Sequence, residues 1–108
     1  GDARVLPEAR RLFETLLAQK PFDERILANL GFVLLNTGEL KQAQNYLLQA
    51  LAYDPAYPQA LENMVYLQLL DNNKVLARHY LDRLVAAAPA HPRREAMERQ
   101  VGMREVRH

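Results

Sequence analysis

The stretch ERILANLGFVLLNTGELKQAQNYLLQALAYDPAY, residues 24–57, contains two helical patterns joined by a turn and closed by a proline. Leucines and alanines recur at three- and four-residue steps in each half, which gives each half one apolar face as a helix. Gly38 supplies the left-handed residue that ends the first helix, and Pro55 stops the second. The stretch therefore predicts a hairpin of two antiparallel helices.

The landmarks of this hairpin recur at one constant interval along the chain, which we call the period. Four series keep the period without a gap: Ala9, Ala43 and Ala77; Phe13, Leu47 and Leu81; Leu16, Ala50 and Leu84; Pro21, Pro55 and Pro89. A fixed period of this length is typical of stacked supersecondary units. The sequence therefore predicts an all-α fold, a superhelix of antiparallel helix hairpins with about six helices.

The period also divides the chain, which we expect to form a single domain over residues 1–108. Residues 1–23 correspond to the second half of a repeat, residues 24–57 and 58–91 to full repeats, and residues 92–108 to a capping or linking helix. Helices are expected over residues 7–19, 24–36, 40–53, 58–71, 74–87 and 93–106. The apolar residues of the last segment form no single stripe, so its packing is left open.

Three positions carry specific expectations about local structure. Pro7 suits the first helical residue, where its missing N–H group loses no hydrogen bond. Asp23 is a candidate N-cap for the helix that follows it. Gly31 lies in the middle of a helix, where it costs about 1 kcal/mol relative to alanine. We therefore expect a neighbouring helix to approach closely at Gly31.

The composition argues against several classes of function. The chain has no cysteine, so disulfides, thiolate catalysis and sulfur-ligated metals are excluded. A formal net charge of +1 argues against a nucleic-acid partner. No apolar run approaches the roughly 20 residues that cross a bilayer, so no membrane insertion is expected.

The residues also lack a catalytic or metal-binding pattern. There is no serine, and neither threonine has a histidine nearby in sequence. The three histidines, His79, His91 and His108, show no ligand spacing, and no glycine-rich phosphate loop is present. We therefore expect no catalytic residue, no metal site and no cofactor, and a protein that is not an enzyme.

The anchors resemble those of the tetratricopeptide repeat family. That family places an apolar residue and then Leu-Gly in the first helix, two alanines around a large apolar residue in the second, and a closing proline. The central repeat matches through Leu27, Leu30, Gly31, Leu34, Gly38, Ala43, Leu47, Ala50 and Pro55. The next repeat matches through Leu61, Met64, Ala77, Leu81, Leu84 and Pro89, with Val65 in place of the glycine and Gln68 in place of an apolar residue. Residues 92–108 depart from the pattern, because polar residues or glycine occupy the packing positions: Glu95, Glu98, Arg99 and Gly102.

The resemblance implies a right-handed superhelix whose first helices line a concave groove for a peptide or helix of a partner protein. The function expected is thus a protein–protein interaction scaffold. Three pairs one period apart are candidates for the groove: Asn29 and Asn63, Phe32 and Tyr66, Leu35 and Leu69. Candidates for its rim are Arg25, Gln59, Glu62 and Arg93. A second interpretation is equally open, in which the asparagines are common consensus residues and the aromatic residues pack between helices.

Two further interpretations concern the partner. A clamp for a terminal carboxylate is not expected, since Ala28, Phe32 and Met97 stand where that clamp needs polar or basic residues and only Asn63 and Arg93 fit. The alternative to a peptide-binding scaffold is a structural module. Such a module would pack on the rest of its parent protein or form a homo-oligomer through residues 7–19 and the C-terminal segment.

Overall fold

Six helices stacked along one axis form the part of the chain that the structure, a computed structural model, describes: residues 5–102. The helices are α1 (Val5–Gln19), α2 (Glu24–Asn36), α3 (Leu40–Tyr53), α4 (Pro58–Leu70), α5 (Lys74–Ala87) and α6 (Arg94–Val101). No β-strand occurs within these residues. The all-α repeat fold predicted from the sequence is confirmed.

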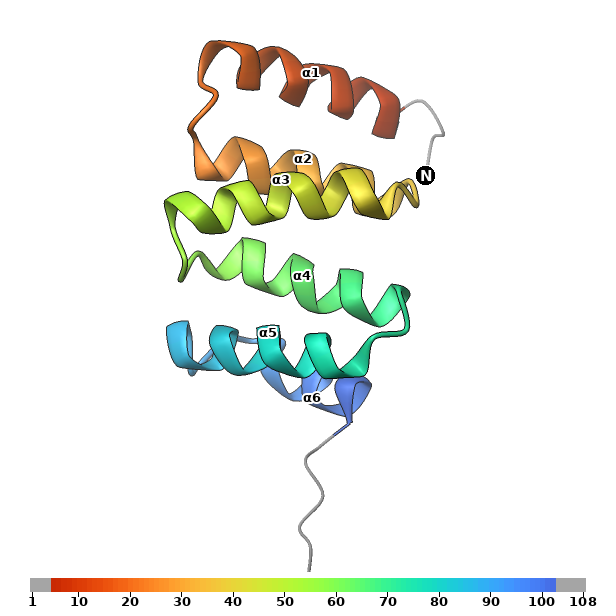
Figure 1. The fold of residues 1–108 in the computed structure, drawn as a ribbon, viewed down its shortest axis with the longest axis vertical. Coiled ribbons are helices and arrows are strands. Elements are labelled where there is room, and N and C mark those ends of the chain that lie inside the picture. Colours follow the sequence, from red (N-terminus) through yellow and green to blue (C-terminus); the bar gives the residue numbers. More distant parts are fainter. Residues whose placement is uncertain (1–4, 103–108) are drawn as a thin grey trace, which may run out of the picture.

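The helices pack as consecutive antiparallel pairs (Figure 1). Helix α2 pairs with α3, and α4 pairs with α5. Each pair is joined to its neighbours, because α1 contacts α2, α3 contacts α4, and α5 contacts α6. Further contacts connect α2 to α4 and α4 to α6. The three helices α2, α4 and α6 therefore form one layer of the stack.

The two hairpin turns have the same backbone geometry. Gly38, after α2, has a φ of 82°, and Asn72, one period later, has a φ of 57°. The N–H group of Glu39 donates to the Leu34 carbonyl at 2.9 Å, and that of Asn73 donates to the Gln68 carbonyl at 2.7 Å. These two bonds, each with a left-handed residue before the donor, are those of Schellman motifs. Asparagine takes the place of glycine in the second turn because it tolerates the left-handed conformation.

The expected N-cap and the expected close approach of helices are both present. Asp23 accepts hydrogen bonds from the backbone N–H groups of Arg25 and Ile26, at 2.9 and 3.4 Å. A Cβ atom added to Gly31 would lie 2.7 Å from the Cγ and Cδ2 atoms of Leu47. Glycine at this position thus allows α2 and α3 to approach closely, and this contact compensates for its low helix propensity.

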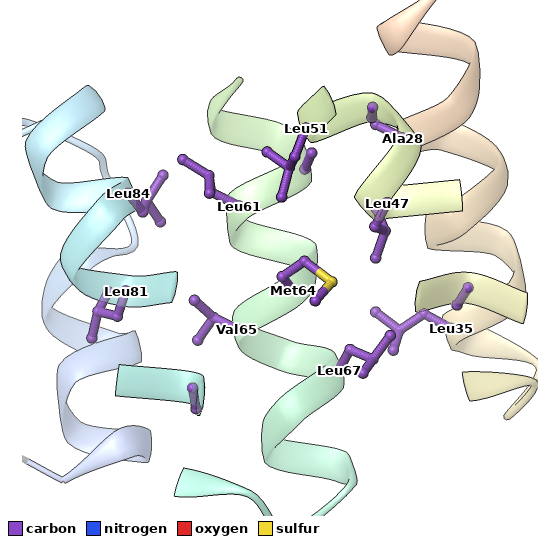
Figure 2. Packing of buried hydrophobic residues seen from close by; sticks show 14 of the residues in the cluster. Ala28, Leu35, Leu47, Leu51, Leu61, Met64, Val65, Leu67, Leu81 and Leu84 are labelled. Carbon is purple, nitrogen blue, oxygen red and sulfur yellow. The ribbon is translucent and has the colours of Figure 1, made fainter. Parts of the chain in front are cut away.

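The apolar core runs through all the hairpins, with α4 at its centre (Figure 2). Leu81 and Leu84 of α5 lie on one side of α4, and Leu35 and Leu47 lie on the other (Figure 2). These four leucines and Met64 of α4 are buried. Because one core spans both full hairpins, neither hairpin covers its apolar face without the other.

Four helix boundaries differ from the prediction. Two differ by a single residue, since α4 ends at Leu70 and α6 begins at Arg94. The other two differ more. Helix α1 begins at Val5, so Pro7 is not its first residue. A proline in the first turn loses no helical hydrogen bond there, because the first four N–H groups of a helix have no intrahelical acceptor. Helix α6 ends at Val101, earlier than expected, since Gly102 has a φ of 90°. Residues 103–106 of that predicted helix lie outside the described residues.

Helix α6 packs through an apolar pair that the sequence pattern did not single out. Met97 and Val101 are one turn apart and buried, and α6 contacts both α5 and α4. Of the positions that departed from the repeat pattern, Glu95, Arg99 and Gly102 are exposed, and Glu98 is half-buried. The last helix therefore covers the end of the core with one face and presents polar side chains with another.

Candidate functional site

A cavity of about 540 Å³ opens where α2, α4 and α6 end. Eight residues line it: Phe32, Leu35, Asn36, Tyr66, Leu69, Leu70, Lys74 and Gln100. We call this cavity the apolar pocket, because aliphatic and aromatic side chains make up most of its lining. Its size is within the range of about 300–1,000 Å³ that is usual for ligand pockets.

Four of the six candidate groove residues meet in the apolar pocket. Phe32 and Leu35 belong to the C-terminal half of α2, and Tyr66 and Leu69 belong to the C-terminal half of α4, one period later. They share one pocket because α2 and α4 contact each other and expose equivalent faces. Leu35 is buried and packs in the core, whereas Phe32 is 48% exposed at the mouth.

The two candidate asparagines do not line the apolar pocket. The Oδ1 atom of Asn29 accepts a hydrogen bond from Nε2 of Gln59 at 2.6 Å. Asn29 borders a different cavity, together with Phe13 and Arg25. Asn63 is 4% exposed, and its Nδ2 atom has no hydrogen-bond partner among the described residues. Asn29 is thus engaged by a neighbouring side chain, and Asn63 is enclosed between helices.

Two of the four candidate rim residues, Arg25 and Gln59, have partners within the chain. The guanidinium of Arg25 lies 3.2 Å from the Asp23 carboxylate, and this hydrogen bond holds the pKa of Asp23 below its ordinary value. Gln59 donates to Asn29 and accepts from the Tyr57 hydroxyl at 3.2 Å. Arg25 lies near the start of α2 and Gln59 near the start of α4, whereas the apolar pocket lies at the C-terminal ends of these helices.

The other two candidate rim residues, Glu62 and Arg93, join α4 to the loop before α6. The guanidinium of Arg93 donates to the Glu62 carboxylate, and this bond raises the pKa of Arg93. The Nε2 atom of His91 lies 3.2 Å from Glu62, while its Nδ1 atom accepts the Arg93 backbone N–H at 3.1 Å. Neutral His91 therefore carries its hydrogen on Nε2 and donates it to Glu62. The cluster fixes the start of α6 against α4.

Four residues that line the apolar pocket were missed by the sequence analysis: Asn36, Leu70, Lys74 and Gln100. The repeat contained a signal for three of them. Gln100 lies one period after Tyr66, which itself lies one period after Phe32, and Leu70 lies one period after Asn36. Lys74 gave no such signal, because it begins the second helix of its hairpin, and only first helices were expected to line the groove.

The chemistry of the apolar pocket is that of a binding surface. Its polar groups are two side-chain amides, one phenol and one ammonium, which can orient a ligand by hydrogen bonds and charge. Across residues 5–102, no cluster of three or more histidine, aspartate and glutamate side chains could hold a metal ion. None of the helices in the same range is long and apolar enough to span a membrane.

Comparison with known proteins supports the resemblance found in the sequence. Residues 6–52 match the family model of the tetratricopeptide repeat. The matched residues extend from α1 through almost all of α3. No curated protein matches the sequence significantly. Tetratricopeptide repeats are generally protein–protein interaction modules, and they are typically non-catalytic scaffolds.

Proposed function

We propose, from the tetratricopeptide repeat of residues 6–52, that this chain is an interaction scaffold that holds a peptide or helix of a partner protein. The observation that carries the proposal is the apolar pocket, built from equivalent positions of two successive repeats. A groove lined by α2 and α4 is the natural site for a segment that lies across both helices. Apolar anchor residues inserted at regular spacing are a recurring mode of peptide recognition.

The exposure of the lining side chains supports this function. Phe32 remains half exposed, and Tyr66 and Leu69 are only partly buried, although all three lie beside an apolar core. Burial of one large apolar side chain contributes about 1.5–3 kcal/mol. The burial of two such anchors would therefore offset part of the free-energy cost of association, so the partner would bind weakly and reversibly.

The amides at the pocket add directional contacts. The Nδ2 atom of Asn36 donates to the Phe32 carbonyl at 2.8 Å, which orients its Oδ1 atom as an acceptor. Gln100 is exposed on α6, at the far edge of the pocket. An amide can donate and accept at once, so these two side chains can bond the backbone of a peptide. We propose that Asn29 and Asn63 do not serve this role, because one is paired and the other is enclosed.

The test uses peptides selected from a random phage-displayed library on the 108-residue chain. Fluorescence anisotropy then gives the Kd of each peptide for wild type, Tyr66→Ala and Tyr80→Ala. Tyr80 is a matched control, because it is also half-buried against the core but belongs to α5, outside the apolar pocket. Truncation of an aromatic anchor costs about 2 kcal/mol or more, so Tyr66→Ala should weaken binding by roughly 30-fold.

The control variant separates binding from folding. Tyr80→Ala should change the Kd by less than about twofold, although its loss of packing lowers the melting temperature as Tyr66→Ala does. If both variants lose affinity in proportion to their stability, the apolar pocket is not the binding site. The proposal then fails, even though the repeat fold stands.

A second candidate function, self-association or packing on a parent protein through α1, is favoured by one observation. The residues Ala43, Leu47, Ala50 and Leu51 of α3 are buried, whereas their counterparts one period earlier, Ala9, Phe13, Leu16 and Leu17, are only half-buried. Leu12, beside them, is 57% exposed. Light scattering of the chain at high concentration tests the self-association form of this function. A strict monomer would reject it.

We also infer that residues 1–108 act as one domain, with full repeats over residues 24–57 and 58–91. The contacts of α3 with α4 and of α5 with α6 support this division, since they join each unit to the next. Such coupling predicts a single cooperative unfolding transition. Two resolved transitions in denaturant would instead indicate units that fold independently.

A further inference from the structure

The helix ends that flank the turn between α4 and α5 carry apolar side chains at three positions where the helix ends around the α2–α3 turn carry polar ones. At equivalent positions, Leu70, Val75 and Leu76 replace Asn36, Lys41 and Gln42. Leu70 is 64% exposed and Val75 is 81% exposed. Both turns have the same Schellman geometry, so the hairpin does not need apolar residues at these positions to fold. We call Leu70, Val75 and Leu76 the turn patch.

The turn patch continues the apolar pocket. Leu70 belongs to both, because it lines the pocket and begins the exposed turn. Val75 follows Lys74, which also lines the pocket. In Figure 1 the α4–α5 turn and the C-terminal end of α6 lie at the same side of the stack. Exposed apolar side chains next to an apolar pocket are typical of a site of interaction, and an occupant that covers both the pocket and Val75 must be longer than one side chain.

Among residues 5–102, Lys74 is the one charged side chain that lines the apolar pocket. None of the ion pairs among residues 5–102 includes Lys74. Asp71, in the same turn, borders a separate cavity together with Lys41. Arg78, one turn further along α5, lies 3.9 Å from Asp82. Lys74 therefore gives the apolar surface a positive charge, and no carboxylate among the lining residues offsets it.

We propose that the occupant is a peptide segment of another protein in which a bulky apolar residue stands beside an aspartate or glutamate. This inference rests on the proposed function and adds the chemistry of the partner to it. The apolar residue enters the pocket between Phe32 and Tyr66, and the acidic side chain pairs with Lys74. A second apolar residue covers Leu70 and Val75. A lysine or arginine at the acidic position would be repelled, so Lys74 selects between partners.

The size and openness of the surface favour a peptide over a small molecule. A compact ligand could fill the 540 Å³ pocket, but it would leave Val75 in water. A peptide can extend from the pocket over the α4–α5 turn and cover both. It also presents a backbone that the Asn36 and Gln100 amides can bond.

The experiment selects random phage-displayed peptides on the 108-residue chain and sequences the enriched population. The Kd of the enriched peptides is then measured for wild type, Lys74→Glu and Lys41→Glu. Lys41 is the matched control, since it is an exposed lysine at the start of a second helix that does not line the apolar pocket. Circular dichroism of each variant checks that the helices are retained.

Enriched peptides should carry an acidic residue within one helical turn of a bulky apolar one. Replacing an attraction by a repulsion at an exposed site should weaken their binding to Lys74→Glu by roughly 5–30-fold. Lys41→Glu should change the Kd by less than about twofold. Added salt should reduce the difference between wild type and Lys74→Glu, because it screens exposed charges.

Two other results would overturn the inference, and they differ in what they say about the proposed function. Peptides without an acidic bias, bound equally by wild type and Lys74→Glu but lost in Tyr66→Ala, reject the acidic partner and leave the peptide-binding function intact. If no peptide is enriched, or if enriched peptides bind Tyr66→Ala as tightly as wild type, both the inference and the proposed function fail.

Discussion

Replacement of Gly31 by alanine tests the close contact between α2 and α3. The added Cβ atom would lie 2.7 Å from the Cγ and Cδ2 atoms of Leu47 and 3.3 Å from the carbonyl oxygen of Ala43. Leu47 is fully buried, so its side chain has no solvent-filled space to move into. The substitution therefore combines a gain in helix propensity with a loss in packing.

The two contributions have opposite signs and different sizes. Alanine is better than glycine within a helix by about 1 kcal/mol. Overpacking of a well-packed core costs about 1–3 kcal/mol. The net expectation is a destabilisation of about 1 kcal/mol, which lowers the melting temperature by roughly 4–8 °C in a chain of this size.

Urea denaturation followed by circular dichroism measures the free energy of unfolding of each variant. Gly38→Ala is a useful control, because Gly38 has a φ of 82° and an added Cβ would meet no atom within 4 Å, so only backbone strain contributes. In a Leu47→Ala background the clash is relieved, and Gly31→Ala should become neutral or stabilising. The coupling between the two sites should then be at least about 1 kcal/mol. A Gly31→Ala variant more stable than wild type would refute the close approach.

Three further substitutions test an ion pair, a helix N-cap and a buried amide. Arg10→Ala removes the two hydrogen bonds from the Arg10 guanidinium to the Glu39 carboxylate, at 3.0 and 3.1 Å, and should cost about 0.5–1.5 kcal/mol and raise amide hydrogen exchange in α1. Asp23→Ala should lower the melting temperature at neutral pH. Since the folded pKa of Asp23 lies below its ordinary value of 3.8, this stabilisation is complete above that pH and is lost as the pH falls through the folded pKa, so melting curves of variant and wild type should converge in acid. Asn63→Leu removes a buried N–H group without a partner and should raise stability by about 1 kcal/mol, whereas Asn29→Leu, which breaks a hydrogen bond to Gln59, should not.

The helices could be predicted because the same turn and helix-end residues recur in each repeat. The turn at Gly38 recurs at Asn72 with the same hydrogen bonds, and the proline that ends each unit recurs at a constant interval. Gly31 was also informative, because a glycine within a helix indicates close packing of a neighbouring helix. Leu47 of α3 makes this close contact. Local patterns of this kind depend on neighbours within one hairpin.

The sequence predicted only those residues of the candidate site that occupy equivalent positions of the first helices in successive repeats. Phe32 and Tyr66 share a pocket because equivalent faces of stacked helices are adjacent. Lys74 lines the pocket because it begins α5 directly after the turn that follows α4, whereas the repeat pattern was searched only for first-helix positions. Gln100 lies one period after Tyr66, but its place at the pocket also depends on how α6 packs, which is through the buried residues Met97 and Val101.

The repeat pattern also could not predict which polar side chains are buried. Asn29 and Asn63 stand at equivalent positions, yet one is half-buried and paired while the other is enclosed. The difference arises from their neighbours, because α4 lies between α2 and α6 whereas α2 has no first helix on its other side among residues 5–102. A repeat pattern assigns both asparagines the same surroundings.

Backbone amide chemical-shift mapping with a selected peptide shows which residues of the chain contact the peptide. The largest shifts should fall on the last turns of α2 and α4, the first turn of α5 and the region around Gln100, which together surround the apolar pocket. Shifts concentrated on α1, or on the outer faces of α3 and α5, would contradict binding at this pocket.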